Sequence, residues 1–186
     1  VTPQLLMNGM AYTKCEGDMQ TLSPTITSPG NGGPYNFAWS NGVTTTSAAT
    51  TSISVTAQLP SPNQYTVTVD DGCTIPSAAA VFTINVNPAP QPTISANPRL
   101  GCSPLTVTLS ALSGSNEQFT WVEFGLTGGP QQVVTLSDSG FYQLTLIATN
   151  TITGCHAQVI EKDYIYSDQD KSYGVLDPLI QSVLRR

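Results

Sequence analysis

The sequence predicts an all-β protein made of two tandem β-sandwich domains and a short C-terminal tail. One strand pattern occurs twice: residues 64–73 and residues 141–155 each begin near an aromatic residue, continue as an alternating apolar run and end in Gly-Cys. Alternation with a period of two places one side of a strand in a core and the other side in water. The order Cys, Trp, Tyr, Cys also occurs in both halves, at an offset of about 80 residues that indicates a duplicated domain.

Composition and charge narrow the classes of function. The 186 residues suit two sandwiches, since one such domain needs about 100 residues or fewer. Only 10% of the residues are charged, the net charge is -6, and Lys and Arg together number 6. So few cations cannot neutralise a row of phosphates, which excludes nucleic acid and disfavours anionic membrane surfaces. No apolar run approaches the roughly 20 residues that span a bilayer, so membrane insertion is not expected.

The first domain is predicted over residues 1–87. Pro3 keeps the first strand at a sheet edge, and the run from Tyr35 to Trp39 places three aromatic rings on one side of a strand. Asn41-Gly42 is a strong signal for a hairpin after that strand. Prolines and glycines at 29–34 predict a loop. The strands are expected at residues 1–12, 19–26, 35–39, 53–55, 64–70 and 81–87, the fourth at the end of a Thr/Ser-rich stretch over 44–55.

A proline-rich linker over residues 88–92 separates this domain from a second one over residues 93–166. Alternating prolines favour an extended, semi-rigid spacer. The strands of the second domain are expected at residues 105–110, 118–124, 131–136, 141–150 and 156–166. The tail over residues 167–186 contains Asp177-Pro178 before an apolar stretch, which is typical of the start of a short helix.

The four cysteines predict disulfides and not a metal site. They are Cys15, Cys73, Cys102 and Cys155, and neither a C-x-x-C pair nor a Cys/His set is present. Two cysteines in each domain favour the pairs Cys15–Cys73 and Cys102–Cys155, although four cysteines allow three pairings. Disulfides form in oxidising compartments, so we expect an extracellular or cell-surface protein.

Two sets of motifs resemble modules of large secreted surface proteins of gliding and related Bacteroidota. The segment Trp39-Ser40-Asn41-Gly42, with the Tyr65 strand and Gly72-Cys73, resembles their Ig-like repeats. Cys102-Ser103-Pro104, Trp121-Val122-Glu123-Phe124-Gly125 and Gly154-Cys155 resemble a PKD-type module, although the usual Trp-Asp-Phe-Gly-Asp-Gly core is altered. The resemblance covers nearly all of the chain except the tail. It implies β-sandwiches, export to the cell surface and a spacer or adhesive role.

The aromatic residues of the repeated pattern are expected to anchor the two cores. Trp39 and Trp121 could stack on sugars, but a Trp on the third strand of such a sandwich usually packs in the core beside the disulfide. Tyr65 and Tyr142 begin the repeated strands and are expected to serve as further core anchors.

No residue set predicts catalysis, a cofactor or a metal site. Asp70-Asp71 and the pair Asp168 and Asp170 could contribute to Ca²⁺ binding, but neither forms a complete loop, so we read them as turn residues and solvated charge. His156 has no nucleophile partner in sequence, and no phosphate-binding loop or catalytic serine motif is present.

The leading hypothesis is a non-catalytic structural and adhesive module of a secreted surface protein. It would bind other protein chains, or a glycan, through loops or open sheet edges. One alternative is a subunit of an extracellular filament, with residues 1–12 or 164–186 donated as a strand to a neighbouring chain. A second alternative is a pair of accessory domains from a secreted hydrolase.

Overall fold

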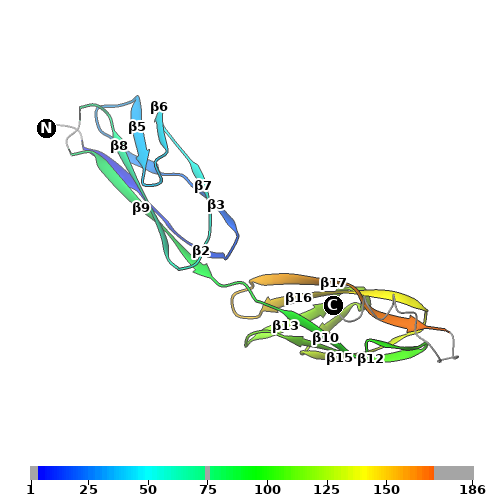
Figure 1. Cartoon of the computed structure of the whole chain (residues 1–186). Coiled ribbons are helices and arrows are strands. Elements are labelled where there is room, and N and C mark those ends of the chain that lie inside the picture. The colour runs from blue at the N-terminus through cyan, green and yellow to red at the C-terminus, as the bar shows by residue number, and fades with distance from the viewer. Residues whose placement is uncertain (1–3, 74–75, 170–186) are drawn as a thin grey trace. The chain divides into compact units, whose positions relative to one another are not determined.

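The all-β fold class is confirmed by the computed structural model, which describes residues 4–73 and 76–169 (Figure 1). The chain divides into two compact units, residues 1–88 and residues 89–186, and the division falls in the proline-rich segment. Each unit has two layers of strands around its own core. The only helical element among the described residues is one turn of 3-10 helix.

Unit 1 combines a five-stranded sheet with two short strand pairs. The sheet has the order β2-β9-β8-β5-β6, and the pairs β1-β4 and β3-β7 make the second layer. The strands are β1 (Leu5–Asn8), β2 (Ala11–Cys15), β3 (Met19–Leu22), β4 (Thr25–Pro29), β5 (Tyr35–Trp39), β6 (Thr44–Ser47), β7 (Ile53–Thr56), β8 (Asn63–Asp70) and β9 (Ala78–Asn87).

The N-terminal segment of unit 1 changes sheets at Gly9. β1 pairs antiparallel with β4, whereas β2 pairs parallel with β9 in the other layer. A Cβ atom at Gly9 would overlap the backbone carbonyl of Val81 on β9. Only glycine fits this close approach of two backbones, so the residue permits the crossing.

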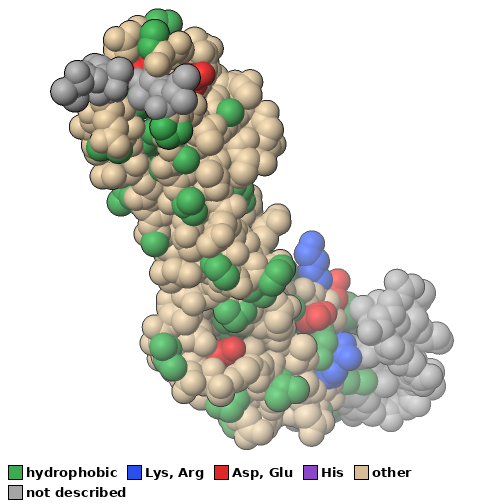
Figure 2. Space-filling view, turned by 90° about the vertical axis from the view of Figure 1, so that its left-hand side faces the viewer, with side chains coloured by type: hydrophobic (Ala, Val, Ile, Leu, Met, Phe, Trp, Pro, Cys, Tyr) green, Lys and Arg blue, Asp and Glu red, His purple; other side chains and the backbone are tan. Residues whose placement is uncertain are grey.

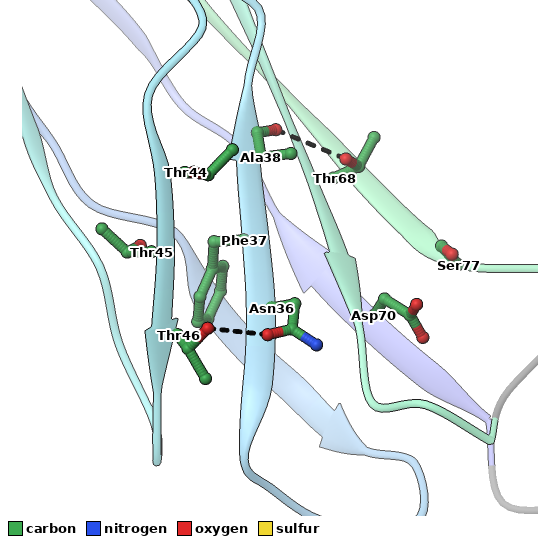
Figure 3. A pocket seen from close by; sticks show the side chains of 9 residues that line it. All are labelled: Asn36, Phe37, Ala38, Thr44, Thr45, Thr46, Thr68, Asp70 and Ser77. Carbon is green, nitrogen blue, oxygen red and sulfur yellow. Dashed lines mark hydrogen bonds between the residues drawn. The ribbon is translucent and has the colours of Figure 1, made fainter.

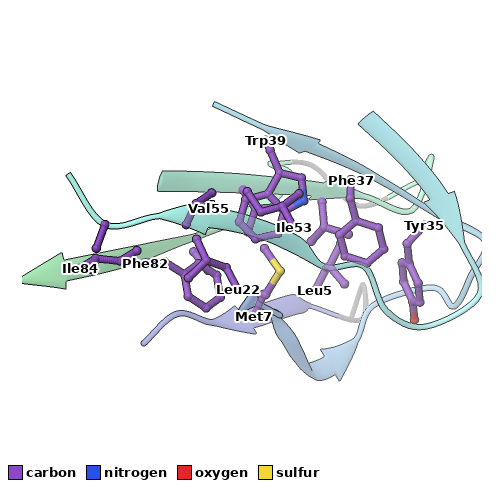
Figure 4. Close-up of a cluster of buried hydrophobic side chains, with 14 of the residues drawn as sticks. Leu5, Met7, Leu22, Tyr35, Phe37, Trp39, Ile53, Val55, Phe82 and Ile84 are labelled. Carbon is purple, nitrogen blue, oxygen red and sulfur yellow. The ribbon is translucent and has the colours of Figure 1, made fainter. Parts of the chain in front are cut away.

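Aromatic and aliphatic side chains from both layers fill the core of unit 1 (Figure 4). The predicted aromatic strand is confirmed, because Tyr35, Phe37 and Trp39 on β5 are all buried. The hairpin after it is also confirmed, and Gly42 adopts a positive φ of 88° there. Leu22 and Phe82 are fully enclosed between the layers.

Unit 2 repeats this plan with longer strands. One layer has the order β10-β12-β15, and the other has the order β11-β17-β16-β13-β14. β10 pairs antiparallel with β12 and β11 parallel with β17, the same change of sheets as in unit 1. The elements are β10 (Thr93–Asn97), β11 (Leu100–Cys102), β12 (Leu105–Leu112), β13 (Glu117–Trp121), η1 (Val122–Phe124), β14 (Leu126–Gly128), β15 (Gln131–Leu136), β16 (Gly140–Asn150) and β17 (His156–Asp168).

A tyrosine ties the loop between β15 and β16 of unit 2 to the start of β16. The Tyr142 hydroxyl donates a 2.8 Å hydrogen bond to the backbone carbonyl of Asp138, four residues upstream. This geometry is the tyrosine corner of Ig-like sandwiches. Tyr65 holds the matching place in unit 1 and packs against that core, but its hydroxyl makes no such hydrogen bond to any described residue.

Three strand predictions need correction. The strand expected over 19–26 is divided into β3 and β4, because Pro24 interrupts the strand pairing. The strand expected over 118–124 ends at Trp121, where η1 begins. The segment 1–12, expected as one strand and a candidate donor, forms two strands that pair within unit 1, β1 over residues 5–8 and β2 over residues 11–15. Of the other candidate donor, residues 164–168 belong to β17, and residues 170–186 lie outside the described residues. The predicted tail helix lies outside the described residues.

The expected disulfide pairing is wrong. Cys73 and Cys102 are free thiols, whereas Cys15 and Cys155 are disulfide-bonded. Strand register gives the reason for unit 1. Cys15 pairs with Asn87 at the end of β9, whereas Cys73 lies near the beginning of that strand. The ten residues of β9 span about 30 Å, whereas bridged Cα atoms lie within roughly 7 Å.

The same argument applies in unit 2. Cys102 pairs with Asp168 at the end of β17, and Cys155 directly precedes the first residue of that strand. The thirteen residues of β17 separate these two cysteines by about 40 Å. Within each unit, the two cysteines therefore lie at opposite ends of the sandwich.

Candidate functional site

An almost uncharged polar array covers part of the outward side of the large sheet in unit 1. We call this array the threonine face. It lies on β5, β6 and β8, where alternate residues Phe37, Val67 and Val69 point into the core and their neighbours point outward. Its members are Asn36, Ala38, Thr44, Thr46, Thr68 and Asp70.

Strand register arranges the threonine face in two rows across the sheet. One row runs Thr46, Asn36, Asp70, and the next runs Thr44, Ala38, Thr68. Neighbouring strands lie about 4.8 Å apart and same-side residues about 6.8 Å apart along a strand, so the groups form a regular grid. Thr46 donates a 2.8 Å hydrogen bond to the side-chain oxygen of Asn36, which fixes the orientation of that amide (Figure 3).

An open hollow of about 520 Å³ lies over this grid. The Thr68 hydroxyl donates to the Ala38 carbonyl at 3.3 Å, while the Asp70 carboxylate accepts the Gly72 backbone amide at 2.7 Å. The face offers hydroxyls, one amide and one carboxylate, which suit hydrogen bonding to a polar ligand. It has no aromatic platform for a sugar ring, because Phe37 is only 1% exposed.

A second hollow, of about 580 Å³, adjoins the β6 edge. Every residue that lines it carries a hydroxyl: Ser23, Thr45, Thr46, Ser47, Thr50, Thr51 and Ser52. Thr45 and Thr51 share a 2.7 Å hydrogen bond between their hydroxyls, which ties β6 to the segment before β7. The hydroxyl-rich stretch of the sequence thus continues the polar surface around the sheet edge.

The two tryptophans are core residues in the structure. Trp39 is 4% exposed and Trp121 is fully buried, so neither presents a ring to a ligand. Neither indole N–H has a hydrogen-bond partner. The free thiol of Cys73 is exposed, so the expected packing of Trp39 beside a Cys15–Cys73 disulfide does not occur. Burial of the large rings offsets the cost of the unpaired donors.

The acidic residues that the structure describes shape turns. The Asp71 carboxylate accepts the backbone amides of Asn31, at 2.8 Å, and Cys73, at 3.1 Å. These bonds are typical of turn-forming aspartates. Residues 4–73 and 76–169 contain no group of three or more metal-ligating side chains. Asp170 lies outside the described residues, and His156 is an exposed residue at the start of β17.

Glu123 has a structural role that the sequence did not reveal. β13 ends at Trp121, so it offers no backbone acceptor for the Thr145 amide of β16. The Glu123 carboxylate accepts that amide at 2.8 Å and the Gln143 side chain at 3.4 Å. Burial acts to raise the pKa of Glu123, but the hydrogen bonds from Thr145 and Gln143 outweigh it, so the pKa lies below its ordinary value.

One side of the molecule shows how its surface is composed. On the side shown in Figure 2, hydrophobic side chains are scattered among polar ones, and few charged side chains appear. Across the described part of the chain, no helix has the length and apolar character that a bilayer crossing requires.

Comparisons with known proteins find similarity of fold but no family. No family model matches the chain, and no curated protein matches it. The N-terminal eight Ig domains of Down Syndrome Cell Adhesion Molecule match with a TM-score of 0.51 and 14% identity, over 85% of this chain and 27% of that one. A three-Ig fragment of titin covers 89% of this chain at 11% identity, with a TM-score of 0.45. This chain spans 65% of the titin fragment.

At 14% identity, the likeness to the cell adhesion molecule concerns the fold alone. The chain is therefore a tandem of Ig-like β-sandwich domains.

The structure shows two residues of the threonine face, Asn36 and Thr68, that the sequence did not single out as surface residues. Asn36 and Thr68 were assigned to strands without attention to their outward sides. The signal was present, because each alternates with buried residues of its strand. The cross-strand register that joins them into one face came only with the structure.

Proposed function

We propose that the chain is a non-catalytic structural and adhesive module of a secreted cell-surface protein, which binds other protein chains through its polar sheet surfaces. The observation that carries the proposal is the threonine face. Its rows of hydroxyl and amide groups lie on a rigid sheet over a buried core and surround an open hollow. A fixed array of this kind orients hydrogen-bonding groups before a ligand arrives.

The chemistry of the threonine face favours a protein ligand. Hydroxyls and amides can pair with peptide N–H and C=O groups, and they cost less to desolvate than charged groups do. The absence of an exposed ring at the hollow makes stacking against a sugar unavailable there. A glycan would have to bind through hydrogen bonds alone.

The structural part of the proposal rests on the duplicated architecture. Each unit buries its own set of apolar side chains, so each has what an independent domain requires. The proline-rich segment 88–92 suits a spacer between them.

The extracellular part of the proposal draws on the cysteines and on motif resemblance. The disulfide-bonded state of Cys15 and Cys155 suits an oxidising compartment. The Trp-Ser-Asn-Gly and Tyr-strand motifs resemble Ig-like repeats of secreted Bacteroidota surface proteins, and the second domain resembles their PKD-type modules. We assign the chain to that class of gliding-adhesin-like proteins as part of the same proposal.

An adhesion assay tests the proposed function. Beads coated with the intact chain pass through a flow cell over immobilised extracellular proteins and, separately, over immobilised glycans. We expect several-fold greater retention on at least one protein surface than albumin-coated beads show. Retention equal to that of albumin beads on every surface would refute the adhesive role. Retention on glycans only would show that the proposed ligand class is wrong.

A further inference from the structure

Unit 2 ends on one side in an unprotected strand edge. β15 pairs with β12 through six consecutive residue pairs and with no other strand among the described residues. The outer N–H and C=O groups of β15 are thus available to another strand.

The side chains of β15 do not block such pairing. Its sequence Gln131–Leu136 contains no charge and no proline, and its register with β12 is unbroken. Charged residues, prolines and β-bulges are the features by which proteins usually protect an edge strand. Elsewhere the chain uses them: the edge strand β2 carries Lys14, and Pro98 and Arg99 directly follow the edge strand β10. β15 has neither of these protections.

Among the open edges of the two sandwiches, β15 is the best suited to association. Val133 points outward and is 64% exposed, although a strand position next to an edge usually favours a polar residue. Six other strands with an open edge have four residues or fewer: β1, β3, β6 and β7 in unit 1, and β11 and β14 in unit 2. β4 ends at Pro29, which cannot donate a backbone hydrogen bond. Leu6 on β1 and Met19 on β3 are also exposed, but each of these two strands has only four residues.

We infer that β15 pairs antiparallel with β15 of a second copy of this chain, about a two-fold axis at Val133. This register places Val133 opposite Val133 of the second copy and matches Gln131 with Thr135, so the edge is complementary to itself. Both copies are uncharged here, so no like charges meet. The pairing continues the three-stranded sheet into one of six strands.

The small surface that two β15 strands would bury indicates a weak association. One six-residue strand per copy buries far less than the roughly 800 Å² per partner of a standard interface. The association is therefore weak in solution. It becomes effective where many copies are held close together.

Sedimentation equilibrium of the intact chain up to about 1 mM tests the inference. The dissociation constant should rise at least about tenfold in V133K, because two lysines would face each other across the pair. The matched control is L112K, which places a lysine at a 73% exposed position on the interior strand of the same sheet and should leave the constant within about twofold. A hydrogen-exchange map of each variant checks that unit 2 stays folded.

A crosslinking variant tests the register. Val133→Cys, made in a chain with Cys73→Ser and Cys102→Ser, should form a covalent dimer through residue 133 when a disulfide reagent such as oxidised glutathione is added. A chain that stays monomeric at 1 mM overturns the inference, as does a dimer that V133K leaves unchanged. Neither result bears on adhesion to other proteins, which the flow assay measures separately.

Discussion

Replacing Tyr142 by phenylalanine should destabilise unit 2 through the loss of a single hydrogen bond. The hydroxyl donates to the Asp138 carbonyl at 2.8 Å, and the ring packs against the core whether or not the hydroxyl is present. A typical hydrogen bond contributes about 0.5–1.5 kcal/mol to stability. Because water can reach the carbonyl once the hydroxyl is gone, we expect a loss of about 1 kcal/mol.

Tyr65→Phe is the matched control in unit 1. Tyr65 begins the corresponding strand, but its hydroxyl has no hydrogen-bond partner among the described residues, so this change should cost less than about 0.5 kcal/mol. Urea denaturation followed by a hydrogen-exchange pulse and mass spectrometry reads the two units separately. The expected shift in the midpoint for Y142F is about 0.3–1 M urea. Equal shifts in both variants, or no shift in Y142F, would refute the assignment of the tyrosine corner.

Three further predictions follow from the structure. Gly9→Ala should lower the stability of unit 1 by more than about 2 kcal/mol in urea denaturation, because the added Cβ overlaps a neighbouring backbone, whereas Gly129→Ala, where nothing lies within 4 Å, should have little effect. The pKa of Glu123 is lowered on folding, so its contribution to unit 2 is complete above the unfolded pKa near 4.3 and is lost as pH falls through the folded value; E123Q should flatten that part of the stability curve between pH 5 and 2, and an unchanged curve would contradict the hydrogen-bond role. A maleimide should label Cys73 faster than the less exposed Cys102, and peptide mass spectrometry that finds the reverse order would contradict the exposure of the two thiols.

The fold class was predicted correctly because the strands of a sandwich show a period-two alternation of apolar and polar residues. The run from Tyr35 to Trp39 alternates without exception, and its three aromatic residues are buried. The strand over residues 105–110 was found in the same way, because Leu105, Val107 and Leu109 of β12 are buried and alternate with exposed residues. A period-two pattern records burial on one side, which is the dominant energetic term for such strands.

The disulfide pairing failed because it depends on distance along a strand and not on local pattern. Counting two cysteines per domain ignores that Cys15 and Cys73 lie at opposite ends of β9. The threonine face was missed for a related reason. Thr44, Asn36 and Thr68 belong to three strands, and only their cross-strand register brings them onto one surface. Local sequence determines which residues point outward, while register determines which of them become neighbours.

The most direct test of the adhesive role is bead retention by a threonine-face variant. In T46K/T68K, two exposed hydroxyls of the array become lysines, while the buried side of the sheet is unchanged. The control S95K/Q158K adds the same charge at exposed strand positions of unit 2. The account predicts that T46K/T68K loses most of the retention on the protein surface that binds the unaltered chain, while the control keeps it. Equal retention by both variants would contradict the account, because the threonine face would then take no part in adhesion.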